Sequence, residues 1–348
     1  MTAAADALDL PETIADEATL EEVMTRPDAG LIADLAKAPG DILILGVGGK
    51  MGPTLARQAK RAAPDRRIVG VARFSDTTVR EDLDASGVET IACDLTRRDD
   101  VAALPKLPNV IFMAGRKFGS TGNEPMTWAM NVHVPGIVGE VFAGSRIVAF
   151  STACVYPYVD IRHQGATEAT PPIAPPGEYA NSCVGRERIF QYLSDAHGTA
   201  GRLIRLSYAI DLRYGVLHDI AVAVRDGQPV PLTMGHVNVI WQGDANACAL
   251  RALAHCTTPT TPLNVSGPEV ASVRAVALAL GDRLGRAPAF AGAEADTAWL
   301  VNTAEQQRLF GYPSVSLARL IDWTADWVSR GGRSLGKPTH FETRGGRY

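Results

Sequence analysis

The chain lacks several features that define specialised classes of protein. It has no apolar run of about 18 residues, which argues against a membrane-spanning helix. Its five cysteines are scattered and form no C-x-x-C pair, and its seven histidines are not clustered. This pattern predicts free thiols in a reducing compartment and no metal site. We also find no internal repeat and no basic array with interleaved aromatic residues, so nucleic acid is not an expected partner.

The chain also has little net charge. A formal charge of −4 and a pI near 6.0 give no general attraction to nucleic acid or to anionic membranes, so an anion site has to be local. The first segment, MTAAADALDLPETIADEA, has neither the basic region nor the apolar region of a secretory signal. We therefore expect a cytoplasmic protein.

The most informative stretch that is present reads ILILGVGGKMGPTLARQAKRAA, residues 42–63. Its first four residues show no polar alternation, which is typical of a strand buried on both faces of a parallel sheet. Gly46, Gly49 and Gly52 follow at three-residue intervals, and a helical pattern then begins at Pro53. The stretch therefore predicts a strand, a glycine-rich turn and a helix.

This turn has the properties of a phosphate site. Glycines allow a sharp turn and a close approach of the backbone, and the free N–H groups at the start of a helix favour a negative charge. Three glycines can also mark only a tight turn, but the strand before them and the helix after them favour a dinucleotide site. We assign to it the turn residues Gly46, Gly48, Gly49, Lys50, Met51 and Gly52.

Further apolar segments extend this unit to a doubly wound α/β fold of the Rossmann type. The predicted strands cover 67–72, 89–93, 109–113 and 146–150, and helical patterns cover 96–104 and 123–142. The second strand runs into Arg73, Phe74 and Ser75, where a basic residue accommodates a ribose 2′-phosphate and an acidic residue binds ribose hydroxyls. We therefore favour NADP over NAD, with Asp76 as the competing signal.

The chain divides into four parts. Residues 1–40 are an extension with two short helical patterns, and residues 41–206 form the dinucleotide-binding domain. Residues 207–330 form mainly a smaller substrate lobe, with some segments returning to the first domain. Residues 331–348 are a polar, glycine-rich tail, which we expect to be an irregular surface or interface strap.

Polar and aromatic residues that fit a small-molecule pocket are concentrated in the second lobe, although an ordinary loop would also explain them. They are Tyr208, Asp211, Arg213, Tyr214, His236 and Asn238. Lys117 and Phe118, in the loop after the fourth strand, are expected at the same edge of the sheet.

Taken together, the segments resemble the extended short-chain dehydrogenases/reductases, which include nucleotide-sugar epimerases and dehydratases. The resemblance covers roughly residues 41–328. It rests on Asn131 and on the motifs GVGGKMG, CDL, VIFMAG, FSTACVYP, YANSCVGRE, VIWQGDANA and NVSGPEVASVRAVALALG, in that order. It implies a nicotinamide dinucleotide, a sugar-like substrate and a homodimer formed by the helices at 123–142 and 179–195.

The resemblance also implies roles for single residues. Thr152 matches the family's active-site hydroxyl, Tyr179 its acid/base, which also contacts the cofactor, and Asn131 a helix residue that supports a proton path. Ala114 and Gly115 would flank the dinucleotide, and Asp94 with Leu95 would lie at the adenine. A capping hydroxyl at Thr152 and a half-buried helix tyrosine at Tyr179 are the simpler interpretations, but the joint pattern favours the active site.

One position departs from the family pattern. The family has a lysine one helical turn after the tyrosine, where the ammonium lowers the pKa of the phenol, and this chain has Cys183. A tyrosine with a pKa near 10 is only about one part in a thousand ionised at neutral pH. Lys117 is the better substitute cation and Arg186 the second candidate, unless both are solvated surface charges. Cys183 as a nucleophile is disfavoured, because a helix-interior thiol is more often a core residue.

We therefore expect an NAD(P)-dependent oxidoreductase or epimerase that acts by hydride transfer on a free sugar, sugar acid, lactone or nucleotide sugar. Family members that use nucleotide sugars commonly hold a substrate phosphate with an arginine where this chain has His236 or Asn238, which weakens the last alternative. The other interpretation is a cofactor-binding protein of the same fold without catalytic activity, acting as a sensor or partner subunit. The missing lysine would permit it.

Overall fold

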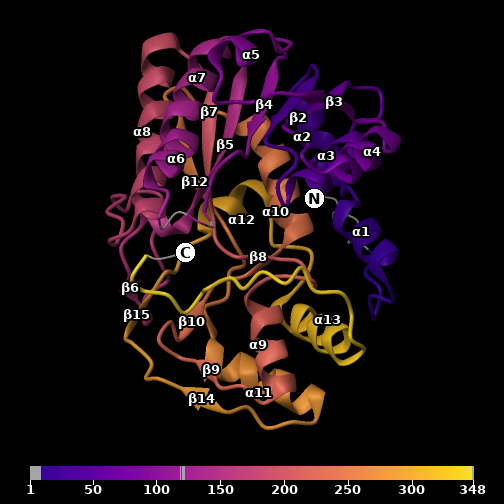
Figure 1. Ribbon diagram of the computed structural model, residues 1–348, viewed down its shortest axis with the longest axis vertical. Helices are drawn as coiled ribbons and strands as arrows, with labels where there is room; N and C mark the ends of the chain where they lie inside the picture. Colours follow the sequence, from indigo (N-terminus) through magenta and orange to yellow (C-terminus); the bar gives the residue numbers. More distant parts are fainter. Residues whose placement is uncertain (1–8, 118, 120–121, 347–348) are drawn as a thin grey trace, which may run out of the picture.

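The computed structural model describes residues 9–117, 119 and 122–346 and shows two lobes, one above the other in Figure 1. The upper lobe contains a seven-stranded sheet of order β12-β7-β5-β4-β1-β2-β3, and all of its strand pairs are parallel. This confirms the predicted doubly wound fold. The strands are β1 (Ile42–Leu45), β2 (Ile68–Ala72), β3 (Glu89–Ala92), β4 (Asn109–Phe112), β5 (Arg146–Thr152), β7 (Gly201–Leu206) and β12 (Thr261–Val265).

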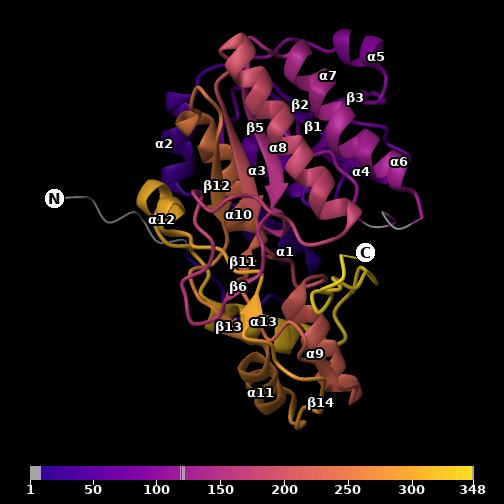
Figure 2. The same ribbon diagram turned by 90° about the vertical axis from the view of Figure 1, so that its left-hand side faces the viewer.

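The unbroken apolar sequence of β1 is explained by helices on both faces of the sheet (Figures 1 and 2). Ile42 and Ile44 pack in one core layer, and Leu43 and Leu45 pack in the other, because alternate side chains of a strand point to opposite faces. One layer is covered by α2 (Ala29–Lys37), α3 (Gly52–Ala62), α4 (Thr77–Ala85) and α10 (Gln242–Arg251), and the other by α5 (Arg98–Ala102), α7 (Val134–Val141) and α8 (Glu178–His197).

The helix predicted over 123–142 is three consecutive helical segments. They are α6 (Glu124–Trp128), a π-helical turn η1 (Ala129–His133) and α7. The wider turn contains Asn131, and such turns frequently occur at functional sites. The predicted helix at 96–104 is also shorter than expected, because only α5 is helical there.

The lower lobe is built on three helices that pack against one another, α9 (Val216–Asp226), α11 (Val273–Leu284) and α13 (Leu317–Ser329). Two short strand pairs border them, β9 (Val230–Pro231) with β14 (Phe290–Ala291) and β10 (His236–Val237) with β13 (Ala271–Ser272). Two more lie between the lobes, β8 (Ala209–Ile210) with β11 (Ile240–Trp241) and β6 (Val159–Asp160) with β15 (Thr297–Ala298). α12 (Ala304–Phe310) packs near β12, so this segment returns to the upper lobe, as do β12 and α10.

Both ends of the described chain reach the region between the lobes. The extension forms α1 (Glu17–Thr25), capped by Asp16, and α2, capped by Asp28, so both predicted helices are present. The tail after α13 has no helix or strand over residues 331–346, as expected, and in Figure 1 it crosses from α13 towards β6. None of the helices that the structure describes is long and apolar enough to cross a membrane.

Candidate active site

A cavity of about 870 Å³ lies between the lobes, at the carboxyl ends of the central strands. Its wall includes the turn after β1, Gly115 after β4 and Thr152 at the end of β5. The strand order reverses between β4 and β1, and ligands of open α/β sheets bind at such switch points. The cavity therefore lies where the fold class binds its ligands.

The glycine turn has the shape of a cradle for a phosphate group. A Cβ atom at Gly46, whose φ is +92°, would lie 2.6 Å from the Ala114 nitrogen, and one at Gly52 would lie 2.0 Å from the Val47 oxygen. These two glycines are required by the turn and by helix packing. A Cβ atom at Gly49 would meet only the Gly46 oxygen, at 3.5 Å, and Gly49 lines the cavity. The space beside Gly49, at the start of α3, is therefore open to a pyrophosphate.

Lys50 places an ammonium group at this end of the cavity. Its Nζ atom lies 4.1 Å from the centre of the Tyr214 ring and donates a 3.4 Å hydrogen bond to the Ala209 carbonyl. The side chain faces the open cavity, yet the protein atoms around its ammonium lower its pKa to about 8 by desolvation, which the charge of Asp211 partly offsets. A bound anion would reverse this shift.

The other cofactor residues predicted from the sequence lie differently. Asp76 lines the cavity, whereas Arg73, Phe74, Ser75, Asp94 and Leu95 do not. The Asp94 carboxylate accepts hydrogen bonds from the backbone and hydroxyl of Thr96, which hold its pKa below the usual range. An acidic side chain rather than Arg73 therefore faces the cavity after β2. Ala114 lies behind Gly46 instead of in the cavity wall, while Met51 and Gly115 belong to it.

Thr152 and Tyr179 meet in the wall of this cavity. Their side chains are hydrogen-bonded, and Tyr179 comes from the first turn of α8. Burial raises the pKa of the phenol well above 10, and the neighbouring thiols of Cys183 and Cys154 raise it further. The charge of Arg186 and the bond to Thr152 act in the opposite direction. The predicted hydroxyl pair is thus assembled, with a phenol that is neutral at pH 7.

Cys183 is a core residue next to Tyr179. Its side chain is fully buried against Ala153, Val155 and Tyr156, and it is absent from the cavity wall. Burial raises the pKa of the thiol to about 11, so it is neutral at physiological pH and has none of the thiolate character of a reactive cysteine.

Arg186 is buried, in contrast to the solvated charge considered from the sequence. It donates to the side-chain oxygen of Asn131, at 2.6 Å, and to the Phe150 carbonyl, at 2.8 Å. Asn131 in turn donates to the Ser182 hydroxyl and to the Arg116 carbonyl and accepts from the Arg116 N–H. These bonds fix η1 against α8 and against the loop that carries Lys117.

Lys117 lies among the groups predicted to be catalytic. It is half-buried, lines the cavity, and donates a 3.4 Å hydrogen bond to the Thr339 carbonyl. Burial lowers the pKa of its ammonium, while Cys154 and Cys183 act to raise it. Lys117 therefore interacts electrostatically with the same two thiols that raise the pKa of Tyr179. Phe118, the neighbouring candidate, lies outside the described residues.

A buried polar network supports the end of β5. The Ser151 hydroxyl donates to Glu187, which forms a salt bridge of 2.7 Å with Arg205. Arg205 also donates to the Tyr156 hydroxyl, which donates to Asn264. Both charged side chains are at most 2% exposed, so each is held by the charge of the other.

The six substrate candidates of the second lobe fall into two groups. Tyr208, Asp211, Arg213 and Tyr214 line the cavity, whereas His236 and Asn238 do not, contrary to expectation. Asn238 donates to the Glu269 carbonyl and accepts from the Val301 N–H, so its amide is structural.

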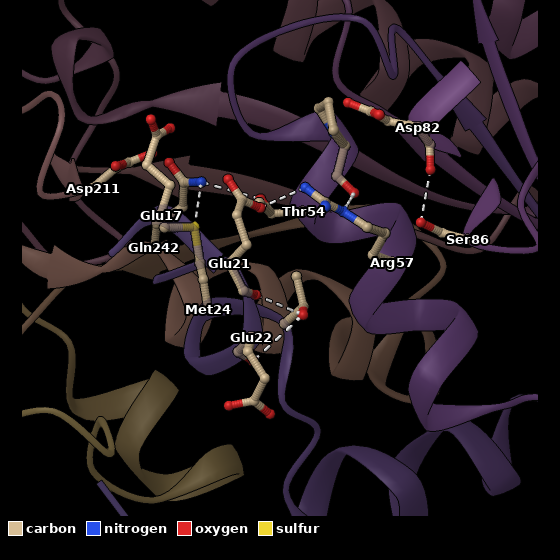
Figure 3. Close-up of polar contacts among 12 residues, drawn as sticks. Glu17, Glu21, Glu22, Met24, Thr54, Arg57, Asp82, Ser86, Asp211 and Gln242 are labelled. Carbon is tan, nitrogen blue, oxygen red and sulfur yellow. Dashed lines mark hydrogen bonds and ion pairs between the residues drawn. The ribbon is translucent and has the colours of Figure 1, made fainter. Parts of the chain in front are cut away.

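Arg213 has partners that the sequence did not reveal. It pairs with Asp211, Glu17 and Glu21, which Figure 3 shows grouped beside α1. Glu21 also binds Arg57 of α3 and lines the cavity. The guanidinium that was expected in a substrate pocket is thus already neutralised by carboxylates of the chain.

Several cavity residues were missed from the sequence. The wall also contains the Glu21 and Arg57 pair, Cys154, Trp299 and the tail residues Arg333, Ser334, Leu335, Lys337 and Thr339. Cys154 lies two residues beyond Thr152 and could have been found from that spacing. The other contacts join segments that are distant in the chain and carry no local pattern. Among the described residues, no group of three or more His, Cys, Asp or Glu side chains could hold a metal ion.

Comparisons with known proteins agree with this architecture. Residues 42–211 match the family model described as the NAD dependent epimerase/dehydratase family. A comparison with curated protein sequences finds no match.

Solved structures show the same fold. A UDP-glucose 4-epimerase from Thermotoga maritima, solved with UDP-glucose, has a TM-score of 0.70 and 15% identity, covering 84% of this chain and 99% of its own. A dTDP-glucose 4,6-dehydratase from Streptomyces venezuelae, solved with NAD, has a TM-score of 0.70 and 19% identity, covering 83% of this chain and 97% of its own. A UDP-Glc/GlcNAc 4-epimerase from Campylobacter jejuni has a TM-score of 0.68 and 21% identity, covering 84% of this chain and 100% of its own. The segment that matches the model of the NAD dependent epimerase/dehydratase family, residues 42–211, is thus also the segment that carries the glycine turn, Thr152 and Tyr179 of the cavity.

Proposed function

We propose that this protein is an NAD-dependent enzyme that oxidises or epimerises a hydroxyl group of a sugar-like substrate. The observation that supports this most directly is the hydrogen-bonded pair of Thr152 and Tyr179, which shares one cavity wall with the open glycine cradle. A nicotinamide dinucleotide bound in this cavity would accept a hydride from the substrate carbon and, in an epimerase, return it.

The residues present fit such a cofactor. The turn at Gly49 and the first N–H groups of α3 would hold the pyrophosphate, with Lys50 supplying a positive charge. Asp76 faces the cavity after β2 and would accept hydrogen bonds from ribose hydroxyls, whereas a 2′-phosphate would meet its negative charge. We therefore replace the expected preference for NADP by NAD, and NAD is also the cofactor bound in the Streptomyces relative.

In this proposal, the chain's own groups move the proton. Tyr179 accepts the proton of the substrate hydroxyl while Thr152 hydrogen-bonds to the same oxygen. The pKa of the phenol is raised by burial, so ionisation at neutral pH needs nearby positive charge. Arg186 supplies a fixed charge behind Asn131, and Lys117 supplies one from the cavity side.

The test measures hydride transfer to NAD through the absorbance of the reduced cofactor. The panel of candidate substrates contains sugars, sugar acids, lactones and nucleotide sugars. Tyr179→Phe should abolish turnover and leave NAD affinity largely intact. Tyr192→Phe is the matched control, because Tyr192 lies on the same helix and is 66% exposed. Turnover that survives Tyr179→Phe would remove the assignment of the acid/base.

The alternative is a cofactor-binding protein without catalysis. The neutral, buried Cys183 favours it, because it leaves the phenol without a cation one helical turn along α8, where the family has its lysine. Tight NAD binding without turnover on the whole panel would establish this alternative.

We also propose a homodimer through α6, η1, α7 and α8. Trp128, Val132, Gly136 and Ile189 line a surface groove there, and Trp128 is 40% exposed. Light scattering at micromolar concentration should give twice the chain mass, and Ile189→Glu should give the monomer. A monomeric wild type would contradict the proposal.

A further inference from the structure

The C-terminal tail, defined here as residues 333–346, is attached to both lobes. On the lower lobe, the Leu335 N–H donates to the Arg213 carbonyl, and Thr339 donates to Asp219 from both its backbone and its hydroxyl, at 2.8 and 2.6 Å. The Phe341 side chain is 3% exposed in the core of that lobe. This segment therefore has a fixed course, although it contains no helix or strand.

The tail is also attached to the segments that carry the active site. Lys117 donates to the Thr339 carbonyl. The Arg344 guanidinium stacks on the Tyr158 ring, 4.0 Å from its centre, and the Tyr158 hydroxyl donates to the Arg344 carbonyl, at 2.7 Å. Figures 1 and 2 both show the tail between the lobes, near the end of α8 that carries Tyr179. The tail therefore forms part of the wall of the cavity that also contains Thr152 and Tyr179.

The size of this cavity limits what binds beside the cofactor. Its volume of about 870 Å³ is within the range of roughly 300–1,000 Å³ that holds one drug-sized ligand. A bound dinucleotide would occupy part of this space, and the tail bounds the cavity on its side. The tail thus limits the space left beside the cofactor, which favours a substrate of sugar size over one that carries a second nucleotide.

The charges of the tail side favour an anion. Arg57 and Arg213 pair with Glu21, and Arg333 of the tail pairs with Glu17. Lys337 also lines the cavity, and it pairs with no carboxylate among the residues that the structure describes. It lies two residues from Thr339, so its backbone is within about 7 Å of the residue bound to Lys117. Lys337 therefore adds a positive charge to the part of the cavity wall that the tail forms.

We propose that the tail is part of the substrate site and selects a small hydroxy acid of sugar size, without a nucleotide, whose carboxylate pairs with Lys337. This inference rests on the function proposed above and narrows its substrate class. Lys117 keeps its place beside Tyr179, and Lys337 binds the charged end of the substrate.

The test is calorimetry on the full-length protein saturated with NAD, using glucuronate, glucose, UDP and UDP-glucose as probes. Because a hydrogen bond to a charged group contributes at least about a factor of ten, glucuronate should bind about tenfold more tightly than glucose. UDP and UDP-glucose should show no binding up to about 1 mM. Lys337→Met should remove the preference for the acid and Lys337→Arg should keep it, while Lys37→Met, on α2 and 65% exposed, is the control without effect.

Hydrogen exchange of the tail gives an independent measurement. Glucuronate should slow exchange at Leu335 and Thr339, because it binds against them. Binding of UDP or UDP-glucose to the wild type, faster exchange of the tail with either, or an unchanged acid preference in Lys337→Met would overturn the proposal. So would undetectable glucuronate binding. None of these measurements uses turnover, so they are separate from the Tyr179→Phe test of the proposed function.

Discussion

Lys117→Met tests whether the loop after β4 supplies a cation to the phenol of Tyr179, the proposed acid/base. Methionine keeps most of the side-chain length and apolar volume and removes the charge. The phenol of Tyr179 and the ammonium of Lys117 both interact electrostatically with the thiols of Cys154 and Cys183. Removal of Lys117 therefore removes a positive charge from the cavity wall that also carries the phenol.

The expected magnitude is the general one for an opposite charge beside an acid, as the hypothesis places Lys117 beside Tyr179. An opposite charge within about 4–6 Å lowers the pKa of an acid by about 1–3 units, and each unit corresponds to about 1.4 kcal/mol. Without Lys117, the phenolate fraction at a fixed pH below the pKa should fall by about 10- to 1,000-fold. Any turnover that depends on the phenolate should fall by the same factor, and its pH profile should shift upwards.

The first assay needs no substrate. The ultraviolet absorbance of tyrosinate is titrated in the wild type and in Lys117→Met, and the titration of the corresponding Tyr179→Phe protein is subtracted from each. The difference reports Tyr179 alone and should move to higher pH in Lys117→Met, whereas Lys117→Arg should restore it in part. An unchanged titration in Lys117→Met would refute the reasoning and leave Arg186 as the cation that acts on Tyr179.

Further variants test other parts of the structure. Gly49→Asp should abolish NAD binding in calorimetry, because its carboxylate fills the phosphate cradle, and Gly144→Asp, a position with no atom within 4 Å of the added Cβ, should not. Arg205→Met should lower the free energy of unfolding in urea by about 3–5 kcal/mol, because Glu187 would be left buried without its partner; a loss below 1 kcal/mol would contradict this. Burial raises the pKa of Asp244 to about 6, so the folded protein binds more protons than the unfolded one between about pH 4 and 6, and stability falls as pH rises through this range. Asp244→Asn should therefore be about 1–3 kcal/mol more stable than the wild type at pH 7.5 and equal to it near pH 4, and equal stability at both pH values would show that the shift is absent.

The strands and the glycine turn could be predicted because each carries a local pattern. β1 is apolar at every position, since both of its faces are buried. Gly52 is required by its contact with Val47 in the turn itself, whereas Gly46 has a φ of +92° and also lies against Ala114, which comes from another segment. The π-helical turn at Asn131 has no such pattern, because it depends on bonds to Arg186 and Arg116, which come from other segments. The same reason explains why the helix over 123–142 was predicted as uniform.

Only those parts of the site that have a local sequence pattern could be predicted, and contacts between distant segments could not. Tyr208 and Arg213 were found from local density of polar residues, but the three carboxylates that neutralise Arg213 come partly from α1. Asn238 has a sequence position that suits substrate binding, yet its amide satisfies two backbone groups far along the chain. The tail was expected to be irregular, which it is, but irregularity gave no indication that Thr339 would lie against Lys117.

The surroundings of Cys183 explain why a neutral residue at this position goes together with a cation at Lys117. The side chain at 183 is fully buried, and the charges of both Arg186 and Lys117 act on its thiol. A lysine there would be a third cation in a closed space, where desolvation and repulsion both oppose its charge. A small neutral residue leaves room for a cation that reaches the phenol from the cavity side instead. We therefore propose that Lys117, in the loop after β4, supplies positive charge to the candidate active site in addition to Arg186, and that its hydrogen bond to the Thr339 carbonyl of the tail holds it there.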